Sequence, residues 1–417
     1  MILGQRQNLL ILLILGLSLL LFGVALRLAR GRTFPPTLQA LLRGKTHYLC
    51  VGILVGLCFS SEIEGAGLLQ HTQVSLVGLL ITWMGLELGI RAEFRELRKI
   101  SPRLLSFDAT QSAVTFVLTF VIAIFFLPRF SRRLLEGVDP LALTSVLSVA
   151  ASVTATWAHE AGRDPSPGPE PEARPQVLGN VVSILLLGVI STLFVPHPPI
   201  PLAGSLFSDS FDALFLSACI GVGTGILMDM AFRVERSLSG AAYLTVALII
   251  ASGGLCEALG LPALFAGFTA GAWLINATLR RRDVQAMSAG VSPVAEGIFM
   301  IVAGSVIGVR SADSPLNLKG VVYLALLLFL SRAIAKTLGV GLLWRLLRPS
   351  RADRAFVGMW QLSQGSLAIA VCVQPLFAPT EGPMQVVTIL SGTALAVALS
   401  QAAASTLRHE ATGNRQQ

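Results

Sequence analysis

Long apolar runs recur from one end of this sequence to the other, and they constrain its fold more than any other feature. A bilayer core about 30 Å thick needs a helix of about 20 apolar residues, and these runs have about that length. Of the 417 residues, 53% are apolar and only 13% are charged, which is far more apolar than a soluble core requires. The sequence therefore predicts an all-α, polytopic membrane protein.

Thirteen such segments are predicted. They lie at about residues 8–28, 46–59, 74–90, 104–127, 139–158, 177–195, 211–232, 241–258, 262–277, 291–310, 319–344, 355–376 and 384–405. The first segment is longer than the apolar region of about 7–15 residues that signal peptides carry, and no A-x-A cleavage site follows it. We therefore expect segment 8–28 to be retained as a helix.

The basic residues lie between the apolar segments. Connections on one side of the predicted membrane hold 23 Lys and Arg residues, against six on the other side. Because cytoplasmic loops retain positive charge, this bias predicts a multi-pass protein of the cell membrane with its N-terminus outside and its C-terminus cytoplasmic. The bases are not clustered on one domain, so we expect no nucleic-acid partner.

Small polar residues gather in the fifth and twelfth segments. The fifth carries Ser148, Ser152, Thr154 and Thr156, and the twelfth carries Gln361, Ser363, Gln364, Gly365 and Ser366. Side chains of this kind can satisfy the backbone of a helix that unwinds within the membrane, although they also allow close helix packing. The two segments are seven apart, an odd offset, so the second would run in the opposite direction.

This spacing predicts inverted repeats with two crossed discontinuous helices. The first repeat would cover about residues 8–195 and the second about 241–405, with 211–232 as a linker helix and 406–417 as a short cytoplasmic tail.

Polar and charged side chains inside apolar helices are costly and mark candidate functional sites. The sixth segment contains Asn180, with Ser183 one turn later, and the eleventh contains Arg332 and Lys336 on one face. These two bases could pair with carbonyls at the end of a broken helix or bind an anionic substrate.

Several acids lie within or near the apolar segments. Glu296 lies about one turn into the tenth segment and is the deepest candidate, whereas Glu87 lies near a helix end, where it could pair with Arg91. Asp108 lies near the start of the fourth segment, at a shallower position than Glu296.

Several stretches resemble one family of transporters. The runs GILVGLCFSSEIEGAGLL and LVGLLITWMGLELGIRAEFRELRK, the helix LCEALGLPALFAGFTAGAWLIN, the Arg-x-x-x-Lys pattern of the eleventh segment and WQLSQGSLAIAV are similar to the monovalent cation:proton antiporter superfamily, in its sodium/hydrogen exchanger and potassium-efflux branch. The resemblance covers nearly the whole chain in the expected order.

The resemblance implies an ion site formed by the two broken helices and the sixth segment. It assigns ion or substrate binding to seven residues: Thr154, Thr156, Asn180, Ser183, Gln361, Ser363 and Gln364. The family carries an aspartate in the sixth segment where this sequence reads Gly179-Asn180-Val181, so the ion-binding acid is absent. An amide does not titrate, and Asn180 therefore cannot carry an exchanged proton.

Three functions follow from these observations. The first is a secondary transporter of the cation:proton antiporter type with altered or lost proton coupling. The second is an uncoupled carrier or channel for a neutral or anionic solute, and the third is a non-transporting accessory protein on the same scaffold. No sequence motif for an enzyme, a cofactor or a metal site is present, so we expect none of these. The resemblance is compatible with a homodimer.

Overall fold

The computed structural model describes most of the chain. It covers residues 45–60, 66–99, 102–130, 140–154, 176–194, 209–235, 237–313, 318–347, 362, 364–376 and 383–416. All regular structure within these residues is helical. The predicted all-α fold class is therefore confirmed, while the predicted first segment, 8–28, lies outside the described residues.

The described helices follow the predicted segments closely. They are α3 Thr46–Ser60, α4 Ala66–Arg91, α5 Phe94–Leu97, α6 Pro102–Phe130, α7 Pro140–Ser152, α8 Gln176–Phe194, α9 Asp209–Val234, α10 Leu238–Ala258, α11 Ala263–Ala277, α12 Arg281–Asp313, α13 Leu318–Leu347, α15 Ser366–Leu376 and α16 Pro383–Gln416. Within the described residues, six helices are long and apolar enough to cross a membrane and four more are shorter and apolar.

Five segment boundaries differ from the prediction by more than four residues. Helix α4 begins at Ala66, before the predicted start at residue 74. Helix α7 ends at Ser152 instead of continuing to residue 158, and α15 begins at Ser366, in the middle of the predicted segment 355–376. Helix α12 begins at Arg281, ten residues before its apolar part, and α16 continues through residues 406–416, where we expected a tail. Apolar content marks the lipid-spanning part of a helix, and it does not mark polar extensions or internal breaks.

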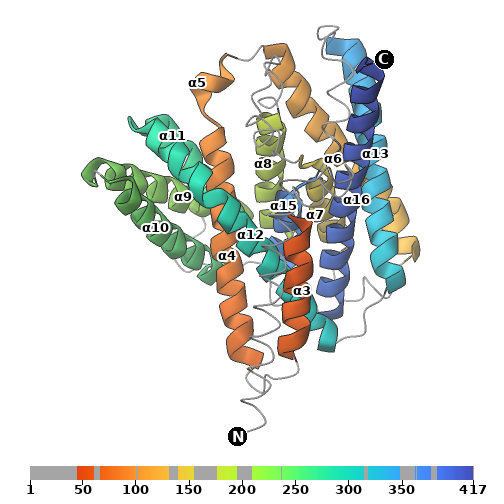
Figure 1. Ribbon diagram of the computed structural model, residues 1–417, viewed down its shortest axis with the longest axis horizontal. Coiled ribbons are helices and arrows are strands. Elements are labelled where there is room, and N and C mark those ends of the chain that lie inside the picture. The colour runs from red at the N-terminus through yellow and green to blue at the C-terminus, as the bar shows by residue number, and fades with distance from the viewer. Residues whose placement is uncertain are drawn as a thin grey trace, which may run out of the picture.

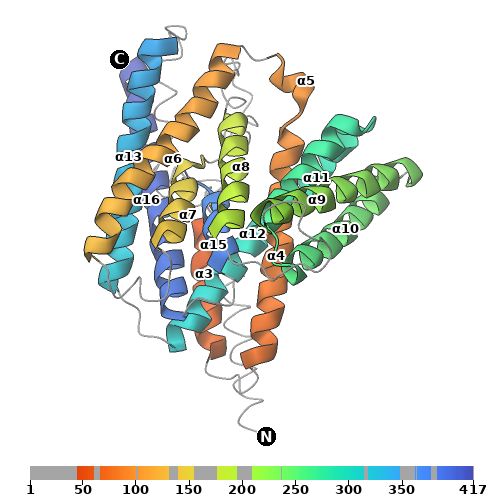
Figure 2. The same cartoon turned by 180° about the vertical axis from the view of Figure 1, so that it is seen from behind.

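The helices form one bundle with a polar centre. Helices α9, α10 and α11 lie on one side and α6, α13 and α16 on the other, with α7, α8 and α15 between them (Figures 1 and 2). Helix α7 packs against α6, α8, α13 and α15, so it lies inside the bundle.

Helix α13 illustrates how lipid and protein faces are separated. Its exposed apolar residues recur every fourth position at Leu326, Leu330, Ile334 and Leu338, whereas Arg332 and Lys336 are buried on another face. Residues four apart share one helix face, so the apolar stripe faces outward and the two bases point into the bundle.

Glycines bring α3 and α12 into main-chain contact. Gly52 and Gly56 on α3 face Gly304 and Gly308 on α12. A Cβ atom at Gly52 would lie 2.0 Å from the carbonyl oxygen of Ile301, so no side chain fits there. Small residues four apart allow this close approach. In lipid, where no hydrophobic effect drives helices together, such van der Waals packing stabilises their association.

A second contact of the same kind joins α4 and α11. Gly85 and Gly89 on α4 face Gly267 and Gly271 on α11, and a Cβ atom at Gly267 would lie 2.0 Å from the carbonyl oxygen of Thr82. The two glycine contacts hold α3, α4, α11 and α12 as a closely packed group.

The substitution Gly304→Ala should lower the melting temperature of the purified protein. Its Cβ would lie 2.2 Å from the Leu49 carbonyl oxygen, and overpacking of this kind costs about 1–3 kcal/mol. The control is Gly290→Ala on the same helix, where nothing lies within 4 Å of the new Cβ. Alanine favours a helix over glycine by about 1 kcal/mol, so the control should be neutral or stabilised. Equal melting temperatures for the two variants would contradict the contact.

Candidate functional site

Helix α7 ends inside the protein. Its last residue is Ser152, and the chain continues without helical structure through Val153 and Thr154, all of them buried. The end of a helix leaves about four carbonyl groups without helical partners, and a buried polar group without a hydrogen bond is costly. The end of α7 must therefore find donors on other elements.

Four side chains supply those donors. One lies on α8, two lie on α13 and one, Gln364, lies just before α15. Five consecutive carbonyls accept hydrogen bonds: Ala150 from Gln364 Nε2 at 2.7 Å, Ala151 from Arg332 Nη1, Ser152 from Lys336 Nζ at 3.5 Å, Val153 from Arg332 Nη1 at 2.7 Å and Thr154 from Asn180 Nδ2 at 2.8 Å. We call these residues with their four donors the α7-end cluster. Arg332 and Lys336 thus pair with broken-helix carbonyls, one of the two roles expected for them.

Asn180 binds both backbone groups of one residue. Its Oδ1 accepts from the Thr154 amide at 2.9 Å while its Nδ2 donates to the Thr154 carbonyl, and the side chain is fully buried. A carboxylate offers only acceptors and could not donate to the carbonyl. These two hydrogen bonds therefore explain why position 180 carries an amide and not an ionised carboxylate.

Hydroxyl groups lie beside this amide. Ser183 Oγ donates to the Gly179 carbonyl at 2.9 Å and lies 2.8 Å from Ser152 Oγ. Thr154 Oγ1 lies 3.3 Å from Lys336 Nζ and accepts its hydrogen bond. The cluster thus gathers neutral oxygen atoms and cationic groups in one buried place.

The start of α15 reaches the same place. Leu362 offers its carbonyl to Arg332 Nε at 3.2 Å, and the Gln364 carbonyl accepts from Gln401 Nε2 of α16 at 2.9 Å. Arg332 therefore joins the backbone before α15 to the end of α7.

Asp108 is a member of the site that the sequence did not predict. This carboxylate from α6 is buried, and its Oδ2 accepts a hydrogen bond from the amide of Gly179 at 2.5 Å. It also interacts electrostatically with Lys336. A signal was present in the sequence, because Asp108, Ser112 and Thr115 share one face of an otherwise apolar helix.

Glu296 and Glu87 belong to a second cluster. Glu296 forms an ion pair with Lys45 at the start of α3 and accepts a hydrogen bond from Ser366 of α15. Glu87 forms an ion pair with Arg91 on its own helix, as the sequence suggested. Glu296, the deepest acid by sequence, therefore has Lys45 and Ser366 as its partners, away from the end of α7.

The described chain brings together six of the predicted residues, which are Thr154, Asn180, Ser183, Arg332, Lys336 and Gln364. Three others, Thr156, Gln361 and Ser363, lie outside the described residues. Within the part that is described, no group of three or more His, Cys, Asp or Glu side chains could hold a metal ion.

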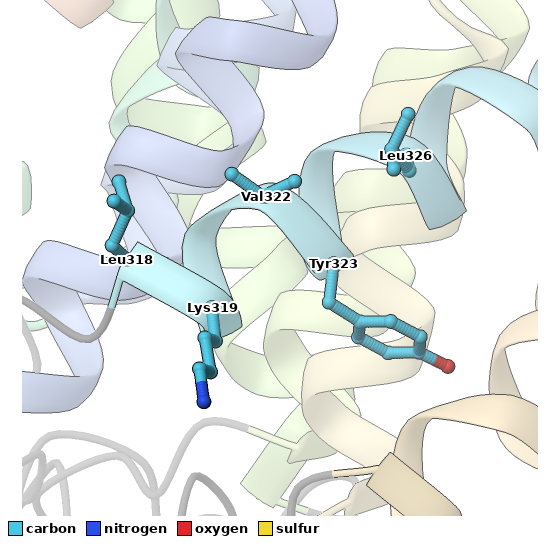
Figure 3. Close-up of a pocket in the computed structure, with 5 residues that line it drawn as sticks. All are labelled: Leu318, Lys319, Val322, Tyr323 and Leu326. Carbon is cyan, nitrogen blue, oxygen red and sulfur yellow. The ribbon is translucent and has the colours of Figure 1, made fainter.

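A surface hollow lies at the start of α13. It is lined by Leu318, Lys319, Val322, Tyr323 and Leu326, all from this one helix (Figure 3). Leu318, Val322 and Leu326 are exposed, whereas the α7-end cluster is buried. The hollow continues the apolar outer stripe of α13 and is not part of the candidate site.

Comparison with known proteins agrees with this architecture. Two solved structures of the sodium proton antiporter MjNhaP1 from Methanocaldococcus jannaschii are similar to this chain. One has a TM-score of 0.59 at 16% identity, covering 96% of this chain and 99% of the other. The second has a TM-score of 0.58 at 15% identity, covering 97% and 96%.

At this identity the likeness establishes the fold. Among curated proteins, none matches the sequence. The family model described as "Sodium/hydrogen exchanger, transmembrane" matches residues 18–405, nearly the whole chain. The chain therefore belongs to the sodium/hydrogen exchanger family.

Proposed function

We propose that this protein is a secondary transporter that exchanges a monovalent cation for protons across the cell membrane. The observation that carries the proposal is the end of α7, a broken helix held in the protein interior by side chains of other helices. Irregular backbone at membrane depth is tolerated where it is buried in protein, and in transporters it forms substrate and ion sites. Membership of the exchanger family supports the same conclusion.

The cation would bind among neutral oxygens of the α7-end cluster. Ser152, Thr154 and Ser183 bring three hydroxyl groups to the interior, with Gln364 nearby on the start of α15. Thr156, Gln361 and Ser363 would complete the site. Hydroxyl and amide oxygens can replace part of the hydration shell of a monovalent cation.

The hydrogen bonds of the two intramembrane bases argue against an anionic solute. Arg332 donates to three backbone carbonyls, and Lys336 donates to a carbonyl and to a hydroxyl. Their positive charges thus neutralise the partial negative charge at the end of a helix. A base already committed in this way is poorly placed to bind an anionic substrate.

Inverted repeats would explain the two glycine contacts. If the second repeat copies the first in reverse orientation, α3 corresponds to α11 and α4 to α12. The contact between α3 and α12 then corresponds to the contact between α11 and α4. Both contacts are formed by paired glycines, as that symmetry requires. The N-terminus would lie outside and the C-terminus in the cytoplasm, as the loop charges indicate.

Exchange should be observable in proteoliposomes that contain a pH-sensitive dye. A gradient of sodium, potassium or lithium should collapse a preformed pH gradient within the range of about pH 6–9, because cation and proton move in opposite directions. Empty liposomes are the control. Solute uptake that is indifferent to the proton gradient, together with no response to any of the three cations, would instead support an uncoupled carrier.

Asn180→Ala should abolish cation exchange and lower the melting temperature. It leaves two buried backbone groups of Thr154 without partners, each of which costs about 1–3 kcal/mol. The matched control is Asn276→Ala, because Asn276 bonds the backbone of Phe94 and Ala92 in the same reciprocal way outside the cluster.

The control should lower the melting temperature while exchange persists. Both variants are compared by thermal unfolding and by dye-monitored flux in the same vesicles. An Asn180→Ala protein that exchanges cations at the wild-type rate would exclude Asn180 from the site.

A further inference from the structure

The exchanged proton needs a titratable group, and α8 supplies none. No residue of Gln176–Phe194 is ionisable, and neither is any residue of Pro140–Thr154. The acid that the family carries near position 180 must therefore be replaced by a group from another element if this chain exchanges protons.

Asp108 of α6 lies at the position where such a group is needed. It is 4% exposed, and its Oδ2 accepts the backbone amide of Gly179, the residue directly before Asn180. Its carboxylate therefore lies against the same turn of α8 that would otherwise carry the acid.

The absence of a side chain at position 179 makes room for this carboxylate. A Cβ atom built on Gly179 would lie 3.0 Å and 3.1 Å from Asp108 Oδ1 and Oδ2, and 2.4 Å from Ser112 Oγ. Even an alanine would compete with Asp108 for this space. The missing side chain of Gly179 on α8 and the carboxylate of Asp108 on α6 therefore fit the same space.

Among the described residues, the charged side chains that face Asp108 come from α13. Lys336 interacts electrostatically with Asp108, and Arg332 with Lys336. Gln111, one turn after Asp108, donates to the Lys336 carbonyl at 3.1 Å and ties the two helices together at this level. Helices α7 and α8, which also pack on α6, present no charge.

Other described acids have basic partners elsewhere. Glu296 pairs with Lys45, Glu87 with Arg91 and Asp229 with Arg233. Asp108 differs from these three because no ion pair within the described residues includes it, while the nearby base Lys336 donates to the end of α7.

We propose that Asp108 carries the exchanged proton, and that it replaces the acid missing from α8. The inference rests on the proposed exchange of a cation for protons. The ionised carboxylate attracts a cation toward the hydroxyls of Ser152 and Thr154. A proton that binds a carboxylate oxygen removes that negative charge and the attraction for the cation, and its loss restores both. Proton and cation therefore compete for one carboxylate, with Lys336 balancing its charge when neither is bound.

The test compares Asp108→Asn with Asp229→Asn in proteoliposomes. Asp229 is a buried acid paired with Arg233 on α9 and serves as the matched control. With the cation that drives the wild-type protein, Asp108→Asn should lose more than about tenfold of the cation-driven proton flux, and Asp229→Asn should stay within about twofold. In weakly buffered detergent, adding the cation should release protons from the wild type and from Asp229→Asn but not from Asp108→Asn.

Moving the carboxylate from position 108 to position 179 tests whether a lost proton flux is due to the missing charge or to misfolding. The double variant Asp108→Ala, Gly179→Asp returns an acid to α8 in the space that Asp108 leaves, and the Ser112 hydroxyl must rotate to admit it. It should recover part of the proton flux that Asp108→Ala alone has lost, with a changed dependence on pH.

The outcomes distinguish this inference from the proposed function. If the wild type exchanges cations for protons and Asp108→Asn does so with the same pH dependence, Asp108 is not the proton carrier and the proposed function stands. If Asp108→Ala is inactive and the swapped acid restores nothing, the charge in this space is not what matters, and the inference is wrong. If the wild type exchanges none of the three cations, the proposed function and the inference both fall.

Discussion

The five carbonyls from Ala150 to Thr154 determine how the interior of this protein is built. They lie where a helix ends in the middle of a membrane protein, and water cannot satisfy them there. Arg332, Lys336, Asn180 and Gln364 donate to them from three different elements. Each of these hydrogen bonds ties the element that carries the donor to the end of α7. The polar centre is a consequence of stopping α7 early.

The need to bond the backbone of Thr154 explains why Asn180 supports the end of α7 while the nearby negative charge belongs to Asp108. A side chain that bonds both backbone groups of Thr154 must donate and accept, which an amide does and an ionised carboxylate does not. The charge that proton exchange needs must then come from elsewhere. Asp108 reaches the adjacent turn of α8 because Gly179 leaves its space open. Structural support and charge are thus separated onto two neighbouring helices.

The sequence predicted the helices better than it predicted the site. Apolar length fixed α8 to within one residue, since 177–195 was expected and Gln176–Phe194 is observed. Asn180, Arg332 and Lys336 were found because buried polar groups in lipid-spanning helices are conspicuous. Asp108 was missed because it lies near the start of its helix, where a carboxylate needs no explanation. Which face of α6 meets Gly179 depends on how the helices pack, and no local pattern contains that information. The polar residues of the fifth segment predicted a break in this helix, but the donors that hold its end at Ser152 are distant in sequence and were not paired with it.

Two kinds of packing in this fold suggest where competing ions can be accommodated. Helices α3 and α12, and likewise α4 and α11, touch through main-chain atoms at glycines, so these contacts change only if whole helices move. Helix α7 is held at its end by side chains, and each of these can change its rotamer and its hydrogen bonds separately. A site that binds a cation in one state and a proton in another needs ligands that rearrange individually. Main-chain contacts at glycines cannot provide this, whereas the carboxylate, amides, hydroxyls and bases at the end of α7 can. The carbonyls at the end of α7 therefore bring together the side chains that the proposed exchange would use.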